Sequence, residues 1–512
     1  MPRGRSVAAV LATIPRLRTA LVTALSMTTT LTLIAGCASN GLDEAAEQSA
    51  DRPTSAPPSA PAGPAESLGG WVAPGLDWTT CDDNDAFDCT MLEVPLDWDD
   101  LAGEQIELAV ARHPADGDRI GMLVSNPGGP GASGLDYVFA EPFDESVSER
   151  FDLVSWDPRG VGRSTAFDCD DQVDEFLAND PDPDTPAEQT AIDSDAKAVA
   201  DDCAANSPGL AANVGTDDVA RDLEAIRVAL GDEPLTYMGF SYGTLIGLRY
   251  LDLFPTKVRA IVLDGVVDPT LGFEAWLEQQ TVAIDASVSR AFEACDDDPD
   301  CPVDDLAATY DKVQAMVEEE PIPAGTEELG PAQLQTGAVY VSYEQLLWPD
   351  LADALADAAD GDGRAMLNLA KGYYDFGGYT AYAAVECLDS PVPVGSEAFR
   401  AFADRLRAIS PRIGGSVANE LLPCAYWPAP TGSIVGPVVA EGAPPVLVLG
   451  NRGDAATPYA NSQRVADTLA DGHLVSFDGE GHTSYGRSAC VNKAVNAYLI
   501  DLDVPRSDPD CR

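Results

Sequence analysis

The amino-acid sequence predicts an α/β fold, in which a mainly parallel sheet is covered by helices on both faces and carries an inserted, mostly helical cap. Three observations support this prediction. Short strand-like runs alternate with helical patterns up to about residue 268. Only helical patterns follow between residues 269 and 430, and strand-like runs return after Pro444. The return of strands favours an insertion into one fold over an independent second domain.

The strand-like runs share one form, an apolar stretch that ends in a turn. The first alternates apolar and other residues, and it reads "IELAVARH". The later ones are more continuously apolar, and they read "IGMLVSNPGGPG", "FDLVSWDPRGVGRS", "PLTYMGFSYG", "VRAIVLDG", "PPVLVLGNRGD" and "HLVSFDGEGH". Continuous apolar runs are typical of strands that are buried on both faces, as parallel strands are.

The helical segments show apolar residues at helical spacing. In "TDDVARDLEAIRVAL" these residues are Val219, Leu223, Ile226 and Leu230. The segment "TLIGLRYLDLF" directly follows a strand and a turn. In the predicted cap, helical patterns occupy "LEQQTVAIDASVSRAFEAC", "LAATYDKVQAMVEEE" and "QLLWPDLADALADAA".

The N-terminus has the features of an export signal. Four arginines precede the apolar stretch "LVTALSMTTTLTLIAG", which is too short and too rich in threonine for a comfortable membrane span. It ends at Cys37 in Ile-Ala-Gly-Cys, which resembles a bacterial lipoprotein box, so we expect a lipid on the Cys37 thiol. The alternative is an ordinary secretory signal. Either way, the protein is expected outside the cytoplasm. With the lipid, it is expected on the outer face of the cell membrane, or partly released to the medium.

These patterns divide the chain into five parts. Residues 1–37 form the signal, and residues 38–66, rich in Ala, Ser, Pro and acids, form a tether that cannot build a core. Residues 67–268 form the first part of the α/β core, and residues 269–430 form the cap. Residues 431–512 complete the core. We expect a monomer.

Charge and cysteine content exclude several classes of function. Acidic residues outnumber basic ones 85 to 30, which gives a formal net charge of −55 and argues against a nucleic-acid partner. With Cys37 set aside, the eleven cysteines leave an even set of ten, which suggests disulfides between sequence neighbours. No Cys-x-x-Cys occurs and the chain has only three histidines, so neither a zinc site nor another cofactor is expected.

Ser241, in Gly-Phe-Ser-Tyr-Gly, is the predicted nucleophile. It follows a strand and precedes a helix, which is the context of a nucleophile elbow. Gly239 and Gly243 lack side chains where the sharp turn crowds the backbone. By itself the pentapeptide also fits a packed turn, and a serine hydroxyl needs a base to remove its proton. The prediction therefore requires a histidine.

His482 is the predicted base, because it lies in "DGEGHTSYG" just beyond a strand's carboxyl end, where open α/β sheets place their catalytic loops. His113 and His473 lack that context. Asp454, which follows "PPVLVLGNRG", is the predicted acid that orients the imidazole. Asp264 is its competitor, because it also ends a strand, and Asp478 is a weaker alternative. The order Ser241, Asp454, His482 is the one expected for an α/β-hydrolase.

Two glycine-containing turns surround this predicted triad. "NPGGPGASG" can present bare N–H groups to an oxyanion, and we predict that Gly129 or Gly128 supplies one N–H and Tyr242 the other. The second turn, "DPRGVGRS", is expected to be architectural, with an ion pair between Asp157 and Arg159 that joins the loops.

Together these motifs resemble the secreted tripeptidyl aminopeptidases, relatives of prolyl iminopeptidase within the α/β-hydrolases. The resemblance covers roughly residues 70–511 and rests on "NPGGPGASG", "WDPRGVGRS", "GFSYGT", "FPTKVRAIVLDGVVDP", "NRGDAATP", "GEGHTSY" and "CVNKAVNAYLIDLDVP". Pro127 stands where prolyl iminopeptidases usually have a histidine, as is common in the tripeptidyl branch.

The resemblance implies a serine aminopeptidase that releases di- or tripeptides from free N-termini. It also implies a cap carboxylate for the substrate ammonium, and "AVECLDSP" offers Glu386 and Asp389. Both could equally be solvated acids in so acidic a chain. A carboxylesterase or lipase on the same scaffold is the alternative activity, since fold does not fix substrate. A lipid-anchored binding protein without catalysis is a third possibility, which the predicted triad disfavours.

Overall fold

The computed structural model describes residues 65–429 and 436–512. The predicted signal, Cys37 and nearly all of the predicted tether lie outside the described residues. Among the described residues, no helix is both long and apolar enough to cross a bilayer.

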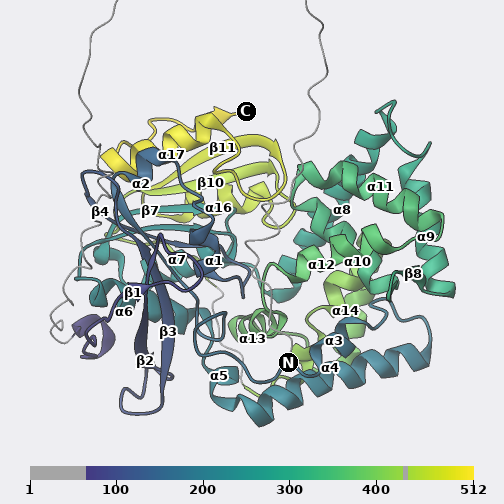
Figure 1. The fold of residues 1–512 in the computed structure, drawn as a ribbon, viewed down its shortest axis with the longest axis horizontal. Helices are drawn as coiled ribbons and strands as arrows, with labels where there is room; N and C mark the ends of the chain where they lie inside the picture. Colours follow the sequence, from purple (N-terminus) through teal and green to yellow (C-terminus); the bar gives the residue numbers. More distant parts are fainter. Residues whose placement is uncertain (1–64, 430–435) are drawn as a thin grey trace, which may run out of the picture. The chain divides into compact units, whose positions relative to one another are not determined.

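Ten of the twelve strands in the described residues form one sheet, in the order β1-β2-β3-β5-β4-β6-β7-β10-β11-β12 (Figure 1). Neighbours from β5 to β12 pair in parallel, whereas β1, β2 and β3 add an antiparallel edge. These ten strands are β1 (Thr79–Thr80), β2 (Asp88–Pro95), β3 (Gln105–His113), β4 (Gly121–Asn126), β5 (Phe151–Trp156), β6 (Leu235–Phe240), β7 (Val258–Asp264), β10 (Val446–Gly453), β11 (Gly472–Glu480) and β12 (Asp510–Cys511). The predicted mainly parallel sheet is confirmed.

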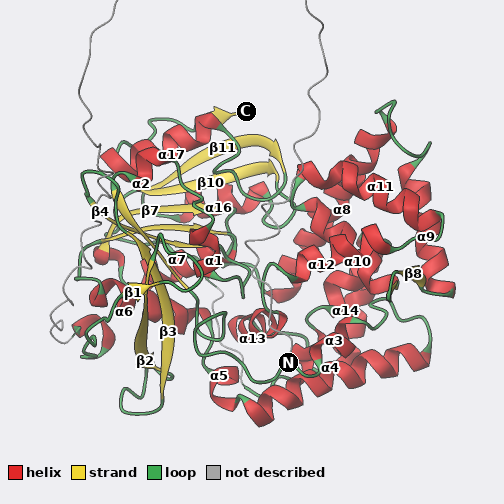
Figure 2. Cartoon of the chain, in the orientation of Figure 1, coloured by secondary structure: helices red, strands yellow, loops and turns green. Residues whose placement is uncertain are grey.

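Helices cover both faces of this sheet (Figure 2). One face packs on α6 (Thr216–Ala229) and α7 (Tyr242–Leu253), and the other on α1 (Gly134–Phe139) and α17 (Ala489–Asp501). Successive strand residues alternate between the two faces, so both must be apolar, as in the pairs Leu123/Val124, Leu153/Val154, Ile261/Val262 and Leu447/Val448. This is why the strands read as continuous apolar runs. The other helices of the core are α2 (Glu145–Ser148), α5 (Pro208–Ala212) and α16 (Tyr459–Thr468).

The helical cap has its own hydrophobic cluster, and Figure 1 shows its helices α8 to α12 gathered apart from the ten-stranded sheet. The cap helices are α8 (Phe273–Asp296), α9 (Leu306–Glu319), α10 (Pro331–Ser342), α11 (Trp348–Ala359), α12 (Arg364–Tyr374), α13 (Tyr379–Asp389), α14 (Ser396–Ile409) and α15 (Gly414–Asn419), with a small hairpin of β8 (Ile322–Ala324) and β9 (Glu327–Leu329). The cluster also includes apolar residues of α3 (Val173–Leu177) and α4 (Pro186–Asn206). The cap is therefore built from two chain segments, whereas the sequence pattern predicts one.

Five disulfides join cysteines that are neighbours in the sequence, as predicted. The pairs are Cys81–Cys89, Cys169–Cys203, Cys295–Cys301, Cys387–Cys424 and Cys490–Cys511. The Cys387–Cys424 bond ties α13 to the segment that follows α15, and both segments take part in the site described below.

Candidate active site

Ser241 lies at a strained turn between β6 and α7. Its backbone has φ 53° and ψ −124°, a region that a residue with a side chain rarely adopts. The Ser241 N–H donates to the carbonyl oxygen of Asp264 at 2.9 Å, and its own carbonyl accepts the Thr244 N–H at 2.8 Å. A Cβ on Gly239 would lie 2.2 Å from the carbonyl oxygen of Gly243, so this turn needs glycine there. These contacts hold the serine hydroxyl at the carboxyl edge of the sheet.

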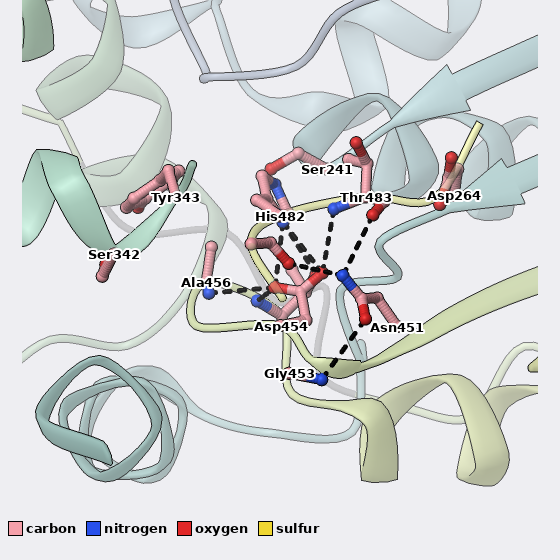
Figure 3. A network of polar contacts seen from close by, with 12 residues as sticks. Ser241, Asp264, Ser342, Tyr343, Asn451, Gly453, Asp454, Ala456, His482 and Thr483 are labelled. Atoms are coloured by element: carbon pink, nitrogen blue, oxygen red, sulfur yellow. Dashed lines mark hydrogen bonds and ion pairs between the residues drawn. The ribbon is translucent and has the colours of Figure 1, made fainter. Parts of the chain in front are cut away.

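His482 lies between Ser241 and Asp454, as Figure 3 shows. Its Nδ1 is 2.9 Å from Asp454 Oδ1 and 3.0 Å from Oδ2. Its Nε2 is buried and has no hydrogen-bond partner among the described residues. In an enzyme without substrate the serine–histidine hydrogen bond is often long, and it tightens when substrate binds.

Asp454 is itself fixed by backbone donors. Its Oδ1 accepts the N–H groups of Ala456 and Thr457, at 3.0 and 2.8 Å, and its Oδ2 accepts the Thr483 N–H at 3.1 Å. With only 4% of its surface exposed, this carboxylate has little water to compete for its oxygens. It can therefore hold one imidazole tautomer and stabilise the imidazolium form.

Asp264, the competing acid, does not reach the imidazole nitrogens. Its Oδ2 accepts the N–H groups of Ser484 and Tyr485, at 3.0 and 2.8 Å. Burial raises its pKa to about 6, against the lowering effect of these two donors and of His482. Asp264 thus holds the chain just beyond His482. The other alternative, Asp478, is exposed and lies 3.8 Å from Arg512.

The other two histidines lie where the parallel strands begin, and Ser241 lies where they end. His113 pairs in register with Leu153 near the start of β5, and His473 with Leu447 near the start of β10. Parallel strands have their starts at one edge and their carboxyl ends at the other. Only His482 is thus near the predicted nucleophile.

The predicted oxyanion loop packs directly on the elbow. A Cβ on Gly128 would lie 2.5 Å from the Phe240 carbonyl oxygen and 3.0 Å from the Tyr242 nitrogen, so only glycine allows this approach. The Gly128 N–H is donated to Asn126 Oδ1 at 3.0 Å. Of the two predicted loop donors, this leaves the N–H of Gly129 available for a substrate oxygen, together with that of Tyr242.

The predicted ion pair between Asp157 and Arg159 does not form. Arg159 is buried and pairs with Asp222, at 2.6 Å between Nη2 and Oδ1. Asp157 instead accepts the N–H of Leu135, the N–H of Arg163 and the Ser133 hydroxyl. Both side chains do join loops, as expected, but neither uses the other as its partner.

The cap contacts the histidine turn on both sides. The His482 N–H donates to the carbonyl oxygen of Tyr343, just after α10, at 2.8 Å, and the two rings meet edge to face at 5.5 Å. Two ion pairs flank this contact, Arg290–Glu480 at 2.6 Å and Arg487–Glu344 at 2.7 Å. Cap and catalytic edge therefore form one site.

Within the cap, tyrosine side chains surround Glu420, and Glu386 lies near it. Glu420 accepts hydrogen bonds from the hydroxyls of Tyr373 at 3.0 Å and Tyr382 at 3.3 Å, and the Tyr379 hydroxyl donates to its backbone carbonyl. Burial raises the pKa of Glu420 to about 7, although the tyrosine donors lower it. Burial, and then the nearby Asp389 and Glu420, raise the pKa of Glu386 well above its ordinary value.

Neither of these glutamates is ion-paired with a basic side chain in the described parts of the chain. Both keep part of their surface accessible, so a cation could approach them. Asp389, the second acid predicted for this role, has both oxygens bonded to Thr216. The sequence pattern missed Glu420. One signal in the sequence could have found it. Glu420 lies four residues before Cys424, and Cys424 forms a disulfide with Cys387, the residue next to Glu386.

A chain of aromatic contacts connects Glu420 to the histidine. Tyr373, which donates to Glu420, meets the Tyr343 ring edge to face at 6.3 Å, and Tyr343 in turn meets His482. The oxyanion loop also reaches α13, because a Cβ on Gly131 would lie 3.3 Å from the Tyr382 nitrogen. The glutamates and the predicted triad therefore share one wall of packed side chains.

The chain is similar to known sequences that include serine peptidases and an esterase. Residues 121–321 match the family described as alpha/beta hydrolase fold, and residues 410–511 match the family described as TAP-like protein. Serine protease Hip1 of Mycobacterium tuberculosis is 36% identical over 453 residues, covering 83% of this chain and 87% of the relative. Carboxylesterase B of the same species is 35% identical over 481 residues, covering 86% and 90%. Tripeptidyl aminopeptidase of Streptomyces coelicolor is 31% identical over 468 residues, covering 85% and 86%.

Proposed function

Because the chain belongs to the α/β-hydrolase family of tripeptidyl-aminopeptidase-like serine hydrolases, we propose that it is an extracytoplasmic aminopeptidase that releases short peptides, most often tripeptides, from free N-termini. Ser241 acts as the nucleophile and His482 as the general base and then the general acid, while the Asp454 carboxylate orients the imidazole. The N–H groups of Tyr242 and Gly129 bind the oxyanion.

The reaction follows from the geometry of these groups. His482 Nε2 takes the Ser241 proton as Oγ attacks the substrate carbonyl, and the Asp454 carboxylate stabilises the resulting imidazolium through Nδ1. The negative charge on the carbonyl oxygen is stabilised by the two backbone N–H groups. When the tetrahedral intermediate collapses, His482 gives the proton to the departing amine. Water, deprotonated by His482, then releases the acyl peptide from Ser241.

Glu386 and Glu420 carry the proposal that the substrate has a free N-terminus. A carboxylate in a poorly hydrated site is costly to ionise without a cation, and burial is the main reason why the pKa values of both glutamates are raised. A substrate ammonium would supply that cation and favour the ionised form. A blocked N-terminus would leave the carboxylates without a partner. The arrangement therefore favours exopeptidase over endopeptidase action.

An esterase is the second candidate, and the relative named carboxylesterase B favours it. The same serine, histidine and oxyanion donors serve both acyl transfers. The two activities differ in what the cap must bind, because a simple ester has no ammonium to place between the glutamates.

Digestion of a peptide ladder followed by mass spectrometry tests the proposal. Each peptide is supplied with a free and with an acetylated N-terminus, together with a short-chain p-nitrophenyl ester. We expect short N-terminal fragments from the free series alone, and the fragment mass gives the number of residues released. Turnover of the ester and the acetylated series, with none of the free series, would falsify the aminopeptidase assignment.

We also propose export and lipid attachment at Cys37. The sequence of the N-terminus supports this proposal, and the five disulfides fit an oxidising compartment. Metabolic labelling with an alkyne fatty acid provides a test. The protein should take up the label and sediment with membranes, while Cys37→Ala should do neither. Equal labelling of both proteins would contradict lipid attachment at this residue.

A further inference from the structure

A buried chain of hydrogen bonds connects cap helix α13 to the first residue of α7. The Thr216 N–H donates to Asp389 Oδ1 at 2.9 Å, and the Thr216 hydroxyl donates to Asp389 Oδ2 at 2.5 Å. The Tyr242 hydroxyl lies 2.7 Å from Thr216 Oγ1. Because the threonine gives its only hydroxyl proton to Asp389, it accepts the proton of Tyr242.

This chain is shielded from water. The exposed fractions are 7% for Asp389, 0% for Thr216 and 4% for Tyr242. Removing one member would leave buried polar groups unpaired, which costs more than the net gain of an ordinary hydrogen bond. The chain therefore has one preferred arrangement.

Tyr242 is the residue whose orientation matters most here. Its backbone N–H is the proposed oxyanion donor, and its neighbour Ser241 has the strained φ of 53°. The side chain is held by its hydroxyl at the far end and by the backbone at the near end. Fixing the ring thus limits rotation of the first turn of α7, which carries the N–H.

We propose that Asp389 is a positioning residue, which through Thr216 holds Tyr242 so that its N–H points at the developing oxyanion. Oxyanion donors stabilise charge only at the correct distance and direction, and small displacements cost rate. Asp389 therefore acts on kcat and not on recognition of the substrate N-terminus. The same contacts fix α13, which carries Glu386, against the nucleophile turn.

Three substitutions test this role without altering Ser241, His482 or Asp454. Tyr242→Phe removes only the hydroxyl, Thr216→Val removes the relay, and Asp389→Asn removes one charge. The matched control is Tyr250→Phe on the same helix, whose hydroxyl donates to buried Glu224 at 2.7 Å, away from the site. It reports the cost of losing a buried hydroxyl from α7.

We expect kcat to fall about tenfold in Tyr242→Phe and Thr216→Val with KM unchanged, a fraction of the 10²–10³ that loss of an oxyanion donor costs. A short ester and a fluorophosphonate should slow in the same ratio, since both use the oxyanion donors. Combining Tyr242→Phe with Asp389→Asn should cost no more than the larger single change, because the residues act in series. Tyr250→Phe should keep wild-type kcat.

Two results would overturn the proposal. The first is wild-type kcat in Tyr242→Phe and Thr216→Val, or a loss that Tyr250→Phe shares. The second is an Asp389→Asn variant in which only the KM for free-N-terminal peptides rises, which would make Asp389 an ammonium ligand. This inference rests on the proposed roles of Ser241 and Tyr242, but the ester and fluorophosphonate rates decide it even if the aminopeptidase assignment fails.

Discussion

Two pairs of acids lie on either side of the site, one pair buried and the other partly accessible, and they differ in the groups that bind them. Asp454 and Asp264, at the carboxyl edge of the sheet, are bonded by backbone N–H groups of the loops that they hold. Glu386 and Glu420, in the cap, lie beside tyrosines and each other without a basic partner in the part of the chain that the structure describes.

The contrast follows from the different functions that we propose for the two pairs of acids. The edge acids must hold a histidine and a serine in one geometry before substrate arrives, so backbone N–H groups of the protein bind Asp454 and Oδ2 of Asp264. The cap acids need a cation from outside. The edge acids therefore orient the catalytic groups. The cap acids, which lack a counter-charge among the described residues, select a substrate that carries a cation.

Among the substitutions at the catalytic edge, Ser241→Ala should have the largest effect on activity. We expect activity on peptides and esters to disappear, together with labelling by a fluorophosphonate, because no other group supplies the nucleophile. The thermal transition should stay near that of the wild type, since only a hydroxyl is lost. Labelling that persists in this variant would mean that another residue reacts.

Asp454→Asn and Asp264→Asn separate the two edge acids. The first should lower kcat on the order of 10⁴, because asparagine stabilises the wrong imidazole tautomer. The second keeps an oxygen that accepts the Ser484 and Tyr485 N–H groups, so kcat should fall no more than about tenfold, in line with a hydrogen bond that is altered but not lost. The reverse order of effects would assign the acid to Asp264.

Glu420→Gln tests the cap pair. Its charge-assisted contact with an ammonium is replaced by a neutral one, so KM for free-N-terminal peptides should rise about 10- to 100-fold, with ester turnover unchanged. Glu318→Gln is the control. Glu318 also belongs to the cap and has a pKa raised to about 7, by burial and by the acids Asp180, Asp182, Asp184 and Glu188. Equal effects of the two substitutions would argue for general charge and against specific recognition.

The pH dependence of stability follows from the raised pKa values. Folding raises the pKa of Glu420 from 4.5 to about 7 and that of Asp264 from 3.8 to about 6, in both cases chiefly by burial. The protonated forms are therefore favoured in the folded state, and the stability that this gives is lost as the pH rises through these values. The melting temperature should be higher at about pH 5.5 than at about pH 8, and Glu420→Gln should reduce the difference. A flat profile would contradict the burial of these acids.

Arg487→Gln should have the smallest effect. It removes a partly exposed ion pair with Glu344 that flanks the contact between Tyr343 and His482. Such pairs contribute about 0–1 kcal/mol, so kcat should fall less than about fivefold, and the difference should shrink in high salt. A much larger loss would mean that the cap holds His482 more strongly than the ion pair itself can explain.

The order of strands and helices could be predicted from the sequence, because each element shows in the pattern of apolar and turn residues that are adjacent in the chain. Continuous apolar runs identified the parallel strands, and the glycines around Ser241 identified the tight turn. His482 was singled out by its place after a strand. The antiparallel strand β2 and the contribution of α3 and α4 to the cap had no comparable local signal.

The sequence by itself determined which chemistry is available, namely a serine at an elbow, a histidine, and acids at strand ends. Only the tertiary structure decided which acid meets which partner. Asp454 and Asp264 both end strands, yet only Asp454 is directed at His482 Nδ1, while Arg159 pairs with Asp222 and not with Asp157. In the same way, Glu420 lies close enough to Glu386 to raise its pKa, and Asp389 accepts a hydrogen bond from Thr216. The physical reason is that a hydrogen bond or an ion pair is made or lost by small changes in the distance between segments far apart in the chain, whereas strand and turn patterns depend on adjacent residues.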